Sequence, residues 1–143
     1  MVDRRTVDEH LVAALDAVLT SVYQVKQVAW AHPRSPRRDA LEDVKAFLFE
    51  QIQVLGDAEE RLDGRSATIT SPSAYNRGNV VGEAGGVEAA VAEVESRLRA
   101  LASDLRARRD LIASSDEARL LDRAAAGLEE RVDRLHRHAT AEN

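Results

Sequence analysis

Residues 87–112 read VEAAVAEVESRLRALASDLRARRDLI, and this stretch decides the fold. Its large apolar residues recur at intervals of three, four or seven positions: Val87, Val91, Val94, Leu98, Leu101, Leu105 and Ile112. Because an α-helix repeats every 3.6 residues, this spacing gathers the apolar side chains on one side of a helix. The stretch therefore predicts an amphipathic helix whose apolar side faces a core.

Three other parts of the chain carry the same spacing, within residues 11–29, 41–62 and 118–135. No comparable stretch alternates with the two-residue period of a strand. We expect helices over about residues 6–32, 37–63, 86–113 and 115–138. Four helices of matched length, each roughly 38 Å at 1.5 Å per residue, predict an all-α four-helix bundle. One domain, residues 1–143, would hold them all.

Local signals place the ends of these helices. Thr6 and Glu9 have the spacing of a capping box, which predicts that Thr6 begins the first helix. The prolines that follow His32 predict that this helix ends there. Ser114 and Glu117 repeat the capping-box spacing before the last helix.

The connections predict how the helices are arranged. Short links join the first helix to the second and the third to the fourth, so each pair should form an antiparallel hairpin. The link between Gly64 and Gly86 is long and rich in Gly, Ser, Thr and Asn. Fully extended, it could reach about 70 Å, enough to run the length of the bundle. We therefore expect a ferritin-like bundle with a long crossover between the second and third helices; the alternative is a linker between two dimerising hairpins.

Composition excludes several classes of function. The chain of 143 residues has no cysteine, which excludes a disulfide scaffold, a thiolate metal site and a cysteine nucleophile. Its net charge of -5 and aromatic content of 3% argue against a nucleic-acid binder. No apolar run approaches the ~18 residues of a membrane span. The charged N-terminal residues do not resemble a signal peptide, so we expect a cytoplasmic location.

Several short motifs resemble those of a known family. The motifs are VKQVAW at 25–30, a short turn with ALE at 40–42, and EERL at 59–62. Together they resemble the first half of the Dps proteins, the ferritin-like DNA-binding proteins from starved cells. DEARLLD at 116–122 is similar to the acidic start of the family's last helix. The resemblance implies a four-helix subunit, a hollow dodecamer, iron oxidation at dimer interfaces, ferric mineral storage and often DNA protection.

The family's ferroxidase centre, as the resemblance implies it, uses two histidines and three carboxylates between subunits. Ala29 replaces the histidine that precedes the family's tryptophan, here Trp30. Glu60 matches the last carboxylate, Asp57 lies one residue from another, and Glu42 stands at the second histidine if one residue is inserted in the turn. We expect little or no ferroxidase activity. A rearranged metal site, with iron as the metal, would use Glu42, Asp57 and Glu60.

Acidic and basic clusters admit two interpretations. As the resemblance implies, Asp116, Glu117 and Asp122 are candidates for a pore that guides cations into a cage. Acidic residues near the start of a helix also complement the helix dipole, and we leave both interpretations open. For a small basic turn after the first helix we favour a role in keeping the hairpin soluble over contact with phosphate or repulsion between neighbouring subunits: Arg34, Arg37 and Arg38.

Four apolar or aromatic residues are candidates for contact between subunits. Tyr75, Val80 and Val81 lie in the long link, which helps to form the two-fold contact in ferritin-like cages. Trp30 is the family's tryptophan beside the metal site at the interface, or a packing residue. Because Ala29 replaces the neighbouring ligand, we favour packing for Trp30.

These observations predict a Dps-like shell-forming protein related to iron storage and detoxification. The partner would be the chain itself, as a homo-oligomer, or a paralogous Dps subunit. Strong DNA binding is not expected, because the body is acidic and neither tail is basic. The alternative is a non-enzymatic helical adaptor that dimerises, and a third interpretation is a cage with a rearranged metal site.

Overall fold

The computed structural model describes residues 2–63 and 86–141. Within these residues the chain forms four α-helices and no strand, so the predicted all-α four-helix fold is confirmed. The helices are α1 (Arg4–Ala31), α2 (Arg38–Asp63), α4 (Gly86–Leu111) and α5 (Ala118–Ala141). The observed ends lie within three residues of the expected ranges, and the end of α2 and the start of α4 coincide with them.

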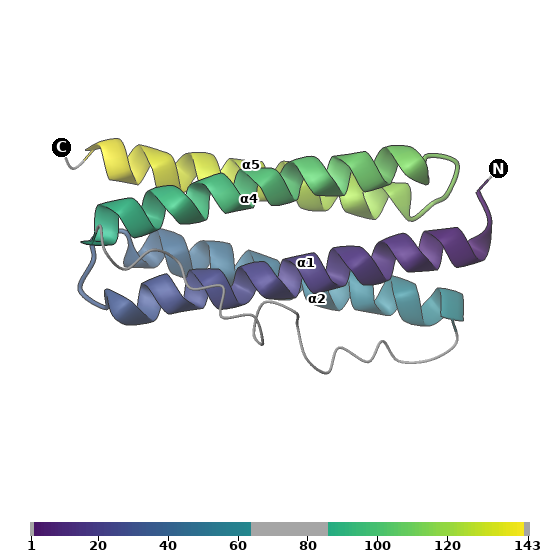
Figure 1. Ribbon diagram of the computed structural model, residues 1–143, viewed down its shortest axis with the longest axis horizontal. Coiled ribbons are helices and arrows are strands. Elements are labelled where there is room, and N and C mark those ends of the chain that lie inside the picture. The colour runs from purple at the N-terminus through teal and green to yellow at the C-terminus, as the bar shows by residue number, and fades with distance from the viewer. Residues whose placement is uncertain (1, 64–85, 142–143) are drawn as a thin grey trace.

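The four helices pack at the corners of a square. Among the described helices, α1 packs against α2 and α4, while α5 packs against α4 and α2. The backbones of the diagonal pairs, α1 with α5 and α2 with α4, do not approach one another closely. Figure 1 shows that α1 and α2 form one antiparallel hairpin, that α4 and α5 form the other, and that α4 runs antiparallel to α1.

The helix directions require α2 and α4 to run the same way. The end of α2 and the start of α4 therefore lie at opposite ends of the bundle (Figure 1). Two antiparallel hairpins joined by one long connection make up the ferritin-like bundle topology. The connecting residues, 64–85, lie outside the described residues.

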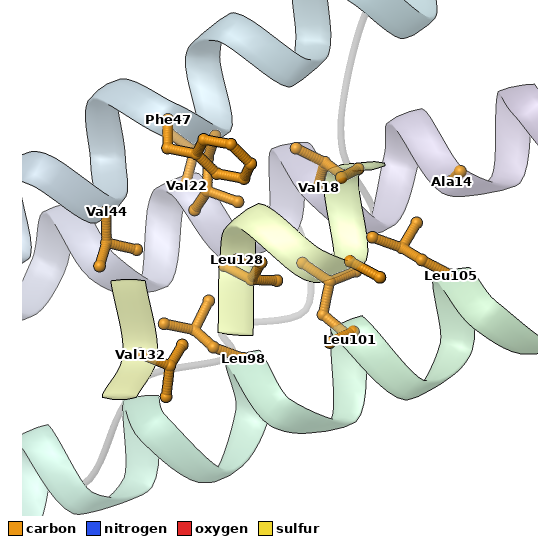
Figure 2. Packing of buried hydrophobic residues seen from close by; sticks show 14 of the residues in the cluster. Ala14, Val18, Val22, Val44, Phe47, Leu98, Leu101, Leu105, Leu128 and Val132 are labelled. Carbon is orange, nitrogen blue, oxygen red and sulfur yellow. The ribbon is translucent and has the colours of Figure 1, made fainter. Parts of the chain in front are cut away.

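The core consists of apolar side chains contributed by all four helices. Figure 2 shows Val22 of α1, Phe47 of α2 and Leu128 of α5 pointing toward one another. Leu98 and Leu101 close the same space from α4 (Figure 2). Most positions of the predicted apolar pattern are buried, which confirms the helical interpretation of that pattern.

Two predicted helix starts are wrong. The N-cap of α1 is Asp3, whose carboxylate accepts a hydrogen bond of 2.8 Å from the backbone N–H of Thr6. Ser114 does not cap α5, because α5 begins only at Ala118; its hydroxyl oxygen accepts a hydrogen bond from the backbone N–H of Val2 at 3.1 Å. The predicted end of α1 is confirmed: His32 is the C-cap, and its N–H donates to the Val28 carbonyl.

Candidate functional site

The three candidate metal ligands all lie on α2 but do not meet within one subunit. Glu42 and Asp57 are separated by fifteen positions of one helix, which is about 22 Å of rise. Glu42 is bound by the Lys45 ammonium at 2.6 Å. Asp57 accepts a hydrogen bond from the Gln53 amide at 3.1 Å, and both Asp57 and Glu60 are exposed. A site that used all three carboxylates would need a second subunit.

The interior of the bundle is filled by apolar side chains rather than by ligands. Ala29 is 5% exposed and packs within the core, where the family implies a histidine. A conventional di-iron bundle places several glutamates and histidines in this interior. Across residues 2–63 and 86–141, no three His, Asp or Glu side chains lie close enough to hold a metal ion.

One carboxylate of α2 is buried although the sequence did not predict its burial. Glu59 is 4% exposed and lies beside the exposed candidate Glu60. A buried ionised carboxylate is costly unless it is paired or hydrogen-bonded. The apolar spacing carried a signal for its burial, because Leu55 and Glu59 are four positions apart on the same side of α2.

The predicted pore residues lie around the turn between α4 and α5. Asp116 is exposed, and Glu117 is partly exposed. Asp122 forms an ion pair with Arg109, which also contacts Asp110 at 2.9 Å. The hydrogen bonds to Asp122 and then to Asp110 raise the pKa of Arg109 above its ordinary value. Arg109 thus offsets part of the charge that Asp122 would contribute to an acidic pore.

An open pocket of about 350 Å³ adjoins this ion pair. Its lining contains three arginines and one carboxylate: Arg109, Ala113, Ala118, Arg119, Asp122 and Arg123. The lining therefore carries a net positive charge, and it would attract anions more readily than cations. Asp116 and Glu117 are not among the lining residues.

The basic turn after α1 does not act as a purely solvated surface. Arg37 is 2% exposed and forms an ion pair with Glu88 at the start of α4. Arg38 donates to the Pro33 carbonyl at 3.0 Å and is exposed. The expectation that Arg37 solubilises the hairpin is wrong, because its side chain joins the start of α2 to the start of α4.

Trp30 is not a packing residue of the core. It is 80% exposed, and the Lys26 ammonium lies 5.7 Å from the centre of its ring. The packing interpretation of Trp30 is therefore wrong, and its assignment to a subunit interface stays a prediction. Tyr75, Val80 and Val81, the other interface candidates, lie outside the described residues.

A second stripe of residues follows the outside of α1, separate from the core stripe. Its members recur at intervals of four and three: Val12, Asp16, Leu19, Tyr23, Lys26 and Trp30. Val12, Lys26 and Trp30 are exposed, Val12 at 47%, and the other three members are partly exposed. We call these six residues the outer stripe of α1. The same 4-3 spacing that revealed the core was the signal for this stripe in the sequence.

Comparisons with known protein families, with curated proteins and with solved structures found no match to this chain. In the described parts of the chain, no helix has both the length and the apolar character required to cross a membrane.

Proposed function

We propose that this chain is the subunit of a self-assembling shell of the Dps type, located in the cytoplasm, with little or no ferroxidase activity. The resemblance of residues 25–30, 40–42 and 59–62 to that family supports the proposal. The ferritin-like directions of the four helices agree with it. Iron, if it enters the shell, would be cargo.

The observation that carries the assembly half of the proposal is the exposure of large apolar side chains at separate places. Trp30, 80% exposed, lies at the end of α1, and Leu111, 64% exposed, lies at the end of α4. These two helix ends are at opposite ends of the bundle (Figure 1). Phe49 of α2 is 50% exposed. A closed shell needs more than one kind of contact between copies, and separate apolar surfaces could supply them.

The expected lack of ferroxidase activity rests on the surroundings of the candidate metal ligands. The Lys45 ammonium forms an ion pair with Glu42. This positive charge disfavours the binding of a divalent cation to the Glu42 carboxylate. Ala29 supplies no ligand atom at the position where the family implies a histidine. Asp57 and Glu60 remain as exposed carboxylates on one turn of α2, and two carboxylates alone make a weak cation site.

A non-enzymatic adaptor that dimerises is the second candidate. The outer stripe of α1 favours it, because one continuous stripe is sufficient for a dimer. The shell needs further contacts, such as one through Leu111. The two candidates therefore differ in the native size of the assembly.

Ferrous oxidation tests the chemical half. We expect the purified protein to oxidise Fe²⁺ in air no faster than buffer does. The Glu60→Ala variant should show the same rate, and Glu50→Ala, which changes an exposed glutamate elsewhere on α2, serves as the matched control. Fast oxygen-dependent oxidation that is lost in Glu60→Ala and kept in Glu50→Ala would contradict the proposal and establish a rearranged metal site.

A further inference from the structure

The spacing of the residues in the outer stripe of α1 is symmetric about the centre of the stripe. Its six positions follow the intervals 4-3-4-3-4, which reads the same in both directions. The stripe spans eighteen positions, or about 27 Å along the helix. A second copy of α1 that runs antiparallel, about a two-fold axis beside position 21, brings each member of the stripe opposite another member.

The apolar members pair well in this arrangement. Val12 lies opposite Trp30 of the partner subunit, and Leu19 lies opposite Tyr23 of the partner subunit. Each pair sets an aliphatic side chain against an aromatic ring. Because a two-fold contact uses the same surface on both copies, each pair occurs twice. Val12 and Trp30 are the most exposed apolar members of the stripe, at 47% and 80%, so both would gain most from burial.

The charged members pair with opposite sign. The antiparallel register places Asp16 opposite Lys26 of the partner subunit, again twice. Asp16 makes no ion pair within the described residues of its own chain, and the recorded contact of Lys26 there is with the ring of Trp30. A parallel pairing would instead set Asp16 against Asp16 and Lys26 against Lys26. Because like charges that face each other disfavour association, these charges favour the antiparallel pairing of the two α1 helices.

We propose that two copies of this chain pair through the outer stripe of α1, antiparallel, with Asp16 of each copy bound to Lys26 of the other. The inference rests on the proposed function, because it names the partner and the register of one contact in the assembly. An unrelated protein is the other occupant that the experiment must separate from a second copy.

Charge reversal tests the register. Asp16→Lys opposes two lysines, and Lys26→Asp opposes two aspartates, so each should weaken self-association by about tenfold in a dilution series followed by sedimentation velocity. The double variant Asp16→Lys/Lys26→Asp restores opposite charges and should recover the wild-type value to within about threefold. Glu50→Lys, an equal charge change on an exposed part of α2, should leave the association unchanged. Circular dichroism of each variant confirms that the helices are formed.

Cysteine cross-linking gives an independent readout, since the chain has no cysteine of its own. A mixture of Asp16→Cys and Lys26→Cys proteins should form a mixed disulfide dimer on mild oxidation. Asp16→Cys alone should not, because the two copies of position 16 are ten residues, about 15 Å, apart along the axis, beyond the reach of a disulfide.

The outcomes separate this inference from the proposed function. A wild-type protein that stays monomeric at all concentrations overturns both. If the protein forms a large assembly whose stability is unchanged by the charge reversals, or is not restored in the double variant, the proposed register is wrong and the proposed shell is not affected. In that case the stripe binds a partner other than a second copy in this register. Cross-linking of Asp16→Cys with itself as readily as in the mixture also overturns the register.

Discussion

At the residue scale, the contact between Gly127 and Phe47 shows what periodicity leaves undetermined. Gly127 lies on α5 and Phe47 on α2, and a methyl group at Gly127 would lie 2.5 Å from Cζ of the Phe47 ring. The Arg131 guanidinium covers the same ring at 4.2 Å from its centre. The apolar pattern predicted which faces are buried. It could not predict this fit, because the fit depends on which helices become neighbours.

We expect Gly127→Ala to lower the free energy of unfolding by about 1 kcal/mol. Alanine gains roughly 1 kcal/mol in helix propensity over glycine, but overpacking a core costs about 1–3 kcal/mol. Gly56→Ala is the matched control: nothing lies within 4 Å of its added methyl group. It should stabilise the protein by about 0.5–1 kcal/mol.

Urea denaturation at one fixed protein concentration measures both glycine variants, because self-association would otherwise shift the midpoint. Phe47→Leu in the Gly127→Ala background should return part of the lost stability by removing the clashing ring. Equal stabilisation by the two alanines would show that the ring moves aside without cost.

At the element scale, the sequence predicted all four helices because each carries its apolar residues at helical spacing. The starts were harder, since Asp3 and Thr6 are both good N-cap residues and only the backbone decides between them. The outer stripe of α1 was overlooked for a different reason. It shares the period of the core stripe, so an apolar outer residue such as Val12 is not conspicuous beside Leu11 and Leu15.

The cap of α1 makes stability depend on pH. The backbone N–H of Thr6 lowers the pKa of Asp3 below its ordinary value of 3.8. The ionised carboxylate therefore stabilises the folded protein above that ordinary pKa, and this contribution is lost as the pH falls through the lowered pKa. We expect Asp3→Ala to lower the thermal midpoint at neutral pH, and the difference from wild type to shrink in acid.

Thermal denaturation between pH 3 and pH 7 measures this effect. Asp3→Asn is the control, because its amide oxygen still caps α1 but does not ionise in this range. At neutral pH its midpoint should lie between those of wild type and Asp3→Ala, and its advantage over Asp3→Ala should not change with pH. An Asp3→Ala deficit that stays constant down to pH 3 would show that the charge of Asp3 does not contribute to the cap.

At the scale of the whole molecule, the number, order and directions of the helices followed from the sequence. Matched lengths and one long link left few ways to pack two hairpins. The contacts of the candidate site were harder to predict from the sequence, since no spacing rule says that Lys45 binds Glu42 or that Arg109 binds Asp122. Contacts between subunits cannot be predicted from the core pattern at all, because they depend on the residues that the core leaves outside.

The native mass in solution tests the central claim, that this bundle is the subunit of a shell. Light scattering behind a sizing column gives it directly. Twelve subunits of 15.7 kDa predict a peak at about 188 kDa. A single species near 31 kDa, two subunits of 15.7 kDa, would contradict the shell and leave the dimeric adaptor.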